Sequence, residues 1–208
     1  AISASKEAYT QQMAALQQDG LLVNDPLLID RIDTITGKLI AQAIIMRPAT
    51  ADWEWSVEII EDPQTINAWC MAGGRMAVYT GLLNQIKPTD DELAQIMGHE
   101  ISHALANHTA ERMSIAMASM AGVVVVGIVA NKPGIAMGAT AAAAALAIKR
   151  PNSRKSESEA DEIGIELAAK AGYDPRAAVT LWRKMAAVGG EGPPEWLSTH
   201  PSPGTREE

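Results

Sequence analysis

The sequence predicts an α+β fold that is mainly α, in which a small β-sheet interrupts a series of helices. The composition favours helices, because 47% of the 208 residues are apolar whereas the only aromatic residues are five Trp and three Tyr. A core of aliphatic, Ala and Met side chains suits packed helices better than a β-sandwich. The spacing agrees, since apolar residues recur mostly at helical intervals and alternate with polar residues in one short stretch.

Length and charge limit the classes of protein to which the chain can belong. Its 208 residues can bury a full hydrophobic core, so we expect a single domain over residues 1–208. The formal net charge of −8 gives no sign of a basic binding surface, so nucleic acid is not an expected partner. Cys70 is the only cysteine, which excludes an internal disulfide framework, and we expect it to be a small buried hydrophobe.

Two helices are expected over residues 1–48. The first covers residues 3–18. The second begins after Asp25, which is a suitable N-cap followed by Pro26 in the first turn, and it ends before Pro48.

A small sheet is expected over residues 53–80. Apolar and polar residues alternate over residues 53–59, which predicts a half-buried strand. Residues 66–71 and 75–79 flank a pair of glycines and predict a hairpin with a glycine turn.

The second half of the chain is predicted to form helices over residues 89–188, followed by coil over residues 189–208. The sequence Thr89-Asp90-Asp91-Glu92 is a capping box, and it opens a helix that we expect to run to at least Arg112. Further helices are expected at residues 154–171 and about 175–188.

Residues 116–148 are strongly apolar and include four consecutive valines and five consecutive alanines. A break at residues 131–134 divides them into two runs of about 15 residues, shorter than the roughly 20 that cross a bilayer. This favours buried or lid-forming helices, and insertion into a membrane is the alternative.

The sequence His99-Glu100-Ile101-Ser102-His103 places an H-E-x-x-H pattern inside the helix that starts at the capping box. His99 and His103 lie one turn apart, only about 40° from each other around the helix, so both imidazoles can reach one metal ion. Glu100 lies near the same face and can take a proton from a metal-bound water. This is the chemistry of a zinc peptidase, and a helix with two internally paired histidines is the alternative.

Two histidines do not complete a metal site, so the third ligand defines the class of site. The extended pattern with a glycine and a third histidine is excluded, because its positions hold Ala106 and Thr109. His108 projects about 180° from His99 on a continuous helix, so we expect it at the surface or in an outer layer.

A carboxylate from the helix over residues 154–171 is the remaining option, as in His₂Glu sites. Glu157 falls on the apolar face of that helix, whereas Glu162 and Glu166 point to the opposite side. A carboxylate on a buried face is costly unless it is paired or bound to metal, so Glu157 is the best candidate ligand. Asp161, one turn further on, can accept the second N–H of a ligating histidine.

Four stretches of the sequence carry a resemblance to a known family. They are Asn67-Ala68 through Gly73-Gly74 to Gly81-Leu82-Leu83, the H-E-x-x-H helix, Ser153-Arg154-x-x-Glu157-x-x-Ala160-Asp161, and Thr199-His200-Pro201 followed by Arg206. In them the chain resembles the HtpX and CAAX-prenyl-protease type of zinc metallopeptidases, especially the soluble periplasmic BepA-like and LoiP-like members. The S-R-x-x-E-x-x-A-D match is the most specific, because it follows H-E-x-x-H in the order that the family requires.

The resemblance implies a zincin fold of the gluzincin kind with one Zn²⁺ held by His99, His103 and Glu157, and with Glu100 as the general base. It also implies that the strand after the glycine pair lines the cleft and offers its edge to an extended peptide. The residues expected to bind the substrate there are Gly74, Arg75, Met76 and Ala77.

Two residues near the end of the chain also acquire expected roles from the resemblance. By itself, His200 in a Pro-rich coil would be an exposed loop residue. In BepA-like relatives a histidine in this T-H-P context can occupy the fourth zinc position and keep the enzyme latent. Arg206 is expected near the cleft, where it would stabilise the developing oxyanion.

Together these inferences predict a zinc endopeptidase that hydrolyses unfolded or damaged envelope proteins. The resemblance implies a periplasmic or envelope-associated protein with links to the membrane or to outer-membrane assembly, and the opening residues show no signal peptide. Two alternatives stay open. One is a chaperone-like binding module with a structural or plugged metal site, and the other is a membrane-associated protease acting on membrane proteins.

Overall fold

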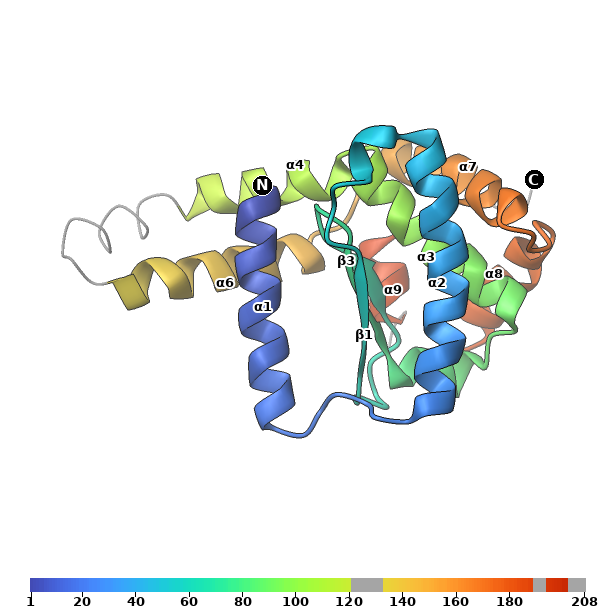
Figure 1. Cartoon of the computed structure of the whole chain (residues 1–208), viewed down its shortest axis with the longest axis horizontal. Helices are drawn as coiled ribbons and strands as arrows, with labels where there is room; N and C mark the ends of the chain where they lie inside the picture. The colour runs from blue at the N-terminus through green and yellow to red at the C-terminus, as the bar shows by residue number, and fades with distance from the viewer. Residues whose placement is uncertain (121–132, 189–193, 202–208) are drawn as a thin grey trace.

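The computed structural model describes residues 1–120, 133–188 and 194–201, and it confirms a mainly helical fold with a small sheet (Figure 1). The sheet lies between α1 on one side and α2 on the other. In chain order the elements are α1 (Ile2–Gln18), α2 (Pro26–Met46), η1 (Pro48–Thr50), β1 (Ser56–Ile60), β2 (Ala68–Cys70), β3 (Arg75–Tyr79), η2 (Leu82–Ile86), α3 (Asp90–Leu105), α4 (His108–Ser119), α6 (Pro133–Lys149), α7 (Arg154–Lys170), α8 (Ala177–Ala187) and α9 (Glu195–Thr199).

The caps that the sequence predicts begin two of these helices. The Asp25 carboxylate accepts the backbone N–H of Leu27 at 3.0 Å, which starts α2. At α3, the Thr89 hydroxyl accepts the Glu92 N–H while the Glu92 carboxylate accepts the Thr89 N–H, so the capping box is complete.

The sheet has the strand order β1-β3-β2, with β1 parallel and β2 antiparallel to β3. The predicted hairpin is present, and Gly73 and Gly74 turn it with positive φ angles of 94° and 85°. A side chain at Gly74 would collide with the Trp55 ring, since an added Cβ would lie 2.6 Å from a ring carbon.

The strand after the glycine pair is not an edge strand, so that expectation is wrong. β3 uses both of its edges, one for β1 and one for β2, and Gly74, Arg75, Met76 and Ala77 therefore cannot pair with a substrate strand. The reason is a long-range pairing. β1 crosses over to lie parallel to β3, which the local pattern of the sequence does not reveal. Among the described strands, β2 forms the outer edge next to the hairpin.

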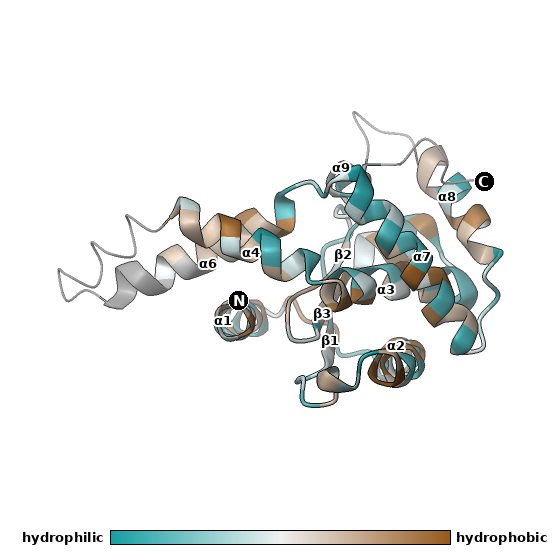
Figure 2. Cartoon of the chain, turned by 90° about the horizontal axis from the view of Figure 1, so that it is seen from above, coloured by the Kyte–Doolittle hydropathy of each residue, from teal (hydrophilic) through white to brown (hydrophobic). Residues whose placement is uncertain are grey.

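The two faces of the sheet bury two apolar clusters, because successive side chains of a strand point to opposite sides. Met76 and Val78 face a cluster formed with α2, α3, α7 and α8. Ala77 faces a second cluster formed with α1, α4 and α6. Figure 2 shows α4 and α6 running side by side, away from α7 and α8.

The helix predicted to run from the capping box to Arg112 is broken, which corrects that expectation. α3 ends at Leu105 and α4 begins at His108. Between them Asn107 adopts a left-handed conformation with φ of 63°, which Asn tolerates better than most residues. The Arg47 guanidinium donates to the Leu105 carbonyl oxygen and to Asn107 Oδ1, and so it closes the end of α3.

α3 and α7 touch through their backbones at two glycines. A Cβ added to Gly98 would lie 2.9 Å from the Gly164 carbonyl oxygen, and one added to Gly164 would lie 2.9 Å from the His99 nitrogen. Side chains at these positions would force the two helices apart. The two glycines therefore let α7 approach the H-E-x-x-H segment closely.

The tail expected to be coil contains the short helix α9, which corrects that expectation. Trp196 in α9 is completely buried, so tertiary packing accounts for the helix rather than helix propensity. Residues 121–132, which hold part of the apolar segment, lie outside the described residues, as do 189–193 and 202–208. Within the described ranges, no helix has both the length and the apolar character needed to cross a membrane.

Candidate metal centre

Four side chains from three parts of the fold meet in one buried group. α3 supplies His99 and His103, the first turn of α7 supplies Glu157, and the segment after α9 supplies His200. One ligand atom from each lies within 4.8 Å of the others, and all four residues are buried. The structure thus brings together the four ligand residues that sequence reasoning singled out.

The spacing of these atoms fits a small divalent cation. The two Nε2 atoms of His99 and His103 lie 3.0 Å apart, and the Glu157 carboxylate oxygens lie 3.3 Å and 3.2 Å from them. A tetrahedral ion with bonds of about 2.0 Å keeps its ligand atoms about 3.3 Å apart. Two imidazoles and a carboxylate are also the donor set of catalytic zinc sites, so geometry and chemistry agree.

Burial and pairing set the charge of these ligands. Burial lowers the pKa of His103 to about 3, so its imidazole is neutral and keeps a lone pair. Burial also opposes charge on His99, but contacts with Asp161 and Glu157 outweigh it and raise its pKa to about 9. Burial opposes charge on Glu157 too, yet both imidazoles hold its pKa well below the usual range. A cation that binds here must therefore displace a proton from His99.

Glu100 lies beside the ligands and is only 1% exposed. Burial alone would raise the pKa of Glu100, but the neighbouring His200, His99 and His103 lower it to about 2. One of its oxygens, Oε1, accepts the indole N–H of Trp196 at 2.7 Å and lies 3.4 Å from His200 Nε2. Glu100 is therefore ionised at neutral pH and can accept a proton.

The second nitrogen of each α3 imidazole faces a different partner. His99 Nδ1 lies 2.8 Å from Asp161 Oδ1 on α7. His103 Nδ1 lies 3.0 Å from Nδ1 of His108, whose Nε2 lies 3.3 Å from Glu159 Oε2. His108 is buried in an outer layer around the centre, and sequence reasoning did not predict its contact with His103. The signal for it was Asn107, which favours a left-handed turn and so a helix break.

The segment after Pro194 covers the centre. The Trp196 ring stacks on the His200 ring with centroids 4.6 Å apart and planes 23° from parallel. His200 Nδ1 donates to the Trp196 carbonyl oxygen at 2.8 Å, and the Asn152 N–H donates to the Thr199 carbonyl oxygen at 3.0 Å. Sequence reasoning missed Trp196, whose only signal was its place one helical turn before His200.

The outer edge of β2 begins next to α9, where the Trp196 N–H donates to the Ile66 carbonyl oxygen. The Met71 N–H donates to the Arg75 carbonyl oxygen and the Tyr79 N–H donates to the Asn67 carbonyl oxygen. In and next to β2, the backbone groups of the odd-numbered residues therefore point toward β3. The backbone groups of Ala68 and Cys70 therefore point away from β3.

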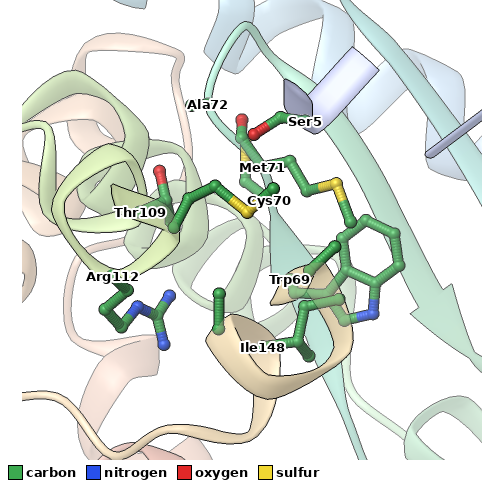
Figure 3. A pocket seen from close by; sticks show the side chains of 11 residues that line it. Ser5, Trp69, Cys70, Met71, Ala72, Thr109, Arg112 and Ile148 are labelled. Atoms are coloured by element: carbon green, nitrogen blue, oxygen red, sulfur yellow. The ribbon is translucent and has the colours of Figure 1, made fainter. Parts of the chain in front are cut away.

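A pocket opens at the end of this edge, between β2, α4 and α6 (Figure 3). Trp69 of β2 and Met71 just after the strand line it, together with Arg112 from α4 and Ile148 from α6. Arg206, expected near the cleft, lies outside the described residues.

Comparison with known proteins assigns the chain to one family. The pattern of peptidase family M48 matches residues 26–208. The chain is 39% identical to mitochondrial metalloendopeptidase OMA1 of Arabidopsis thaliana over 71% of its own length and 29% of the relative. It is 36% identical to human metalloendopeptidase OMA1 over 77% of this chain and 32% of the relative. It is 31% identical to the putative beta-barrel assembly-enhancing protease of Vibrio cholerae, over 93% of this chain and 40% of the relative.

The chain thus spans less than half the length of each of these relatives. The family match covers most of the chain, including the helices α3 and α7 that carry the buried histidines and glutamate. A chain with this match and with relatives at these identities belongs to peptidase family M48.

Proposed function

We propose that the chain is a zinc-dependent endopeptidase with a single Zn²⁺ held by His99, His103 and Glu157. The observation that carries this proposal is the buried convergence of two imidazole nitrogens and a carboxylate at 3.0–3.3 Å, with ionised Glu100 beside them. When bound, zinc would supply an acidified water and a polarised peptide carbonyl. Membership of a metallopeptidase family supports the same assignment.

Glu100 is the proton carrier in this proposal. Its carboxylate accepts the proton of the attacking water and delivers it to the leaving amine. The low pKa of about 2 keeps Glu100 unprotonated before attack. Asp161 accepts from His99 and so keeps the other nitrogen of that ring turned toward the metal.

The substrate is proposed to be an extended polypeptide that pairs with the outer edge of β2. The backbone groups of Cys70 point outward along that edge, and a peptide in strand conformation can use them. The adjacent pocket in Figure 3 would receive a substrate side chain. Because pairing requires extended backbone, this arrangement favours unfolded segments over compact native proteins.

The resting state is proposed to be latent. A ring nitrogen of His200 lies within 4.8 Å of a ligand atom from each of the other three metal-site residues, so its imidazole would compete with the attacking water for the open position. At the same time, the Trp196 indole N–H donates a hydrogen bond to Glu100 Oε1. Movement of α9 would release both groups together.

The cellular role is proposed to be the removal of unfolded or damaged envelope proteins, in a periplasmic or envelope-associated location. Similarity over 93% of the chain to a protein named as a putative beta-barrel assembly-enhancing protease supports this role. Relatives named as mitochondrial metalloendopeptidases indicate that family members with this domain also work in another compartment.

The test combines His200→Ala with Glu100→Gln in the full chain. We expect His200→Ala to cleave a reduced, unfolded model protein, and the double variant to lose cleavage while elemental analysis still finds one zinc. Glu157→Ala should lose the zinc. Undiminished cleavage by the double variant would refute Glu100 as the general base.

The burial of His200 also favours a second candidate, a binding module whose metal site is permanently plugged. His200→Ala separates the two functions, because only a protease gains cleavage when the plug is removed. A variant that binds unfolded protein but never cleaves it would favour the binding module.

A further inference from the structure

A chain of contacts leads from the metal centre to the surface through a histidine that the proposed reaction does not use. His108, at the first residue of α4, is 8% exposed and lies between His103 on α3 and Glu159 on α7. The two imidazoles meet through their Nδ1 atoms at 3.0 Å. The outer nitrogen of His108 lies 3.3 Å from Glu159 Oε2, and about half of the Glu159 side chain is exposed.

The chemistry of these three groups fixes where the protons lie. Carboxylates only accept, so His108 must carry its proton on Nε2 to bond Glu159. His103 Nε2 is the nitrogen that faces Glu157 and His99. When it offers its lone pair to a cation, the ring proton of His103 lies on Nδ1. His103 Nδ1 then donates to His108 Nδ1 across the 3.0 Å contact, and His108 keeps its own proton on Nε2, toward Glu159.

Two further neighbours of His103 Nε2 have opposite preferences. The Asn152 side-chain amide nitrogen lies 3.3 Å away and, as a donor, also favours a bare Nε2. Glu157 Oε1 lies 3.2 Å away and, as an acceptor, favours a proton on Nε2 in the absence of metal. The tautomer of His103 with its proton on Nε2 cannot bind a cation through that nitrogen. The contact with His108 favours the other tautomer, with the proton on Nδ1.

We propose that His108 and Glu159 are positioning residues for the metal ligand His103. They hold it in the tautomer with Nε2 unprotonated and so increase the affinity of the centre for a divalent cation. The proposal rests on the proposed function only in taking His103 as a metal ligand. It gives the two imidazoles of the H-E-x-x-H helix different supports, a direct carboxylate for His99 and an imidazole backed by a carboxylate for His103.

The helix break at Asn107 makes this contact. On a continuous helix His108 would lie five residues after His103, about 140° around the axis, and its ring would point away. The left-handed Asn107 turns the chain so that α4 starts beside the ring of His103.

The test measures Zn²⁺ affinity of the full chain by competition with a chelator, without reference to cleavage. His108→Leu keeps bulk but removes the acceptor, and we expect affinity to fall about 10- to 100-fold, as for other outer partners of metal ligands. His108→Asn places an amide oxygen where the imidazole has Nδ1, so we expect it to restore most of the affinity. A purely structural role would not distinguish these two variants in this way.

Two glutamates on α7 provide the matched pair. Glu159→Ala should weaken Zn²⁺ binding by a few-fold, whereas Glu162→Ala, at an exposed position one turn further on, should leave it unchanged. Both sites are at the surface, so these variants remain informative if His108→Leu does not fold. The visible spectrum of the Co²⁺-loaded protein should change in His108→Leu and match wild type in His108→Asn.

The outcomes separate this proposal from the proposed function. Wild-type affinity in His108→Leu, or equal losses in the Leu and Asn variants, would overturn the positioning role and leave the peptidase assignment standing. The expected affinities together with no cleavage by His200→Ala would support the positioning role and count against the peptidase. A wild-type chain that does not bind Zn²⁺ would overturn both.

Discussion

The floor of the metal centre and its cover are built in opposite ways. The floor consists of α3 and α7, helices of 16 and 17 residues whose backbones touch at Gly98 and Gly164. The cover is α9, a helix of five residues held by Trp196 and by a few hydrogen bonds. The contrast indicates that the metal ligands of α3 and α7 are preorganised, whereas the fourth group, His200, is carried by a separable segment.

The largest effect is expected from breaking the floor with Gly164→Ala. The added methyl group would meet the backbone of His99, which cannot yield, so we expect a loss of about 3 kcal/mol in the free energy of unfolding. Zn²⁺ affinity should fall with it, because α7 carries Glu157. Denaturant unfolding and chelator competition measure the two effects.

Gly37→Ala on α2 is the matched control, because a Cβ there meets no atom within 4 Å. It should be neutral or stabilise the chain by up to about 1 kcal/mol, as alanine does in helices. Equal stability of the two variants would show that the close backbone contact between α3 and α7 does not depend on glycine at position 164.

Breaking the cover should act on activity rather than on stability. We expect His200→Ala to raise the rate of cleavage of an unfolded polypeptide by about tenfold. This corresponds to a loss of about 1.4 kcal/mol in the free energy that favours the closed, latent state. Its melting temperature should stay close to that of wild type, in contrast with Gly164→Ala. A large loss of stability without a gain in the rate of cleavage would show that His200 is a structural part of the centre, like the residues of α3 and α7.

The charge of the floor predicts a pH dependence for the metal-free protein. The pKa of His99 is raised to about 9 in the fold, so its stabilising charge is complete below the unfolded value of 6.5 and is lost as pH rises toward 9. Stability should therefore fall by about 1 kcal/mol for one pH unit above 6.5. Denaturant unfolding of the metal-free chain at several pH values measures it, and His99→Gln should remove the slope.

The floor could largely be predicted from sequence because its signals are local. Capping residues and helical spacing predict α3, and the burial cost of a carboxylate singles out Glu157, which the structure buries completely against both imidazoles. The buried positions of His99 and His103 follow from the same spacing.

The remaining features depend on contacts between distant segments. The contact of His108 with His103 depends on one left-handed residue. The free edge of the sheet depends on a parallel crossover, which moves it from β3 to β2. The helix α9 forms because Trp196 finds a buried place beside Glu100, 96 residues away in the chain. Asn107 is a local signal for the helix break behind the first contact, and no local pattern of the sequence predicts the other two features.

The smallest effect is expected from Trp196→Phe, which tests how the cover holds the floor. A phenyl ring can still stack on His200, but the hydrogen bond to Glu100 is lost. We expect the rate of cleavage to rise about threefold, because a single hydrogen bond contributes little net free energy. If the rate falls instead, the indole orients Glu100 for catalysis, and Trp196 then belongs with the floor although it lies on α9.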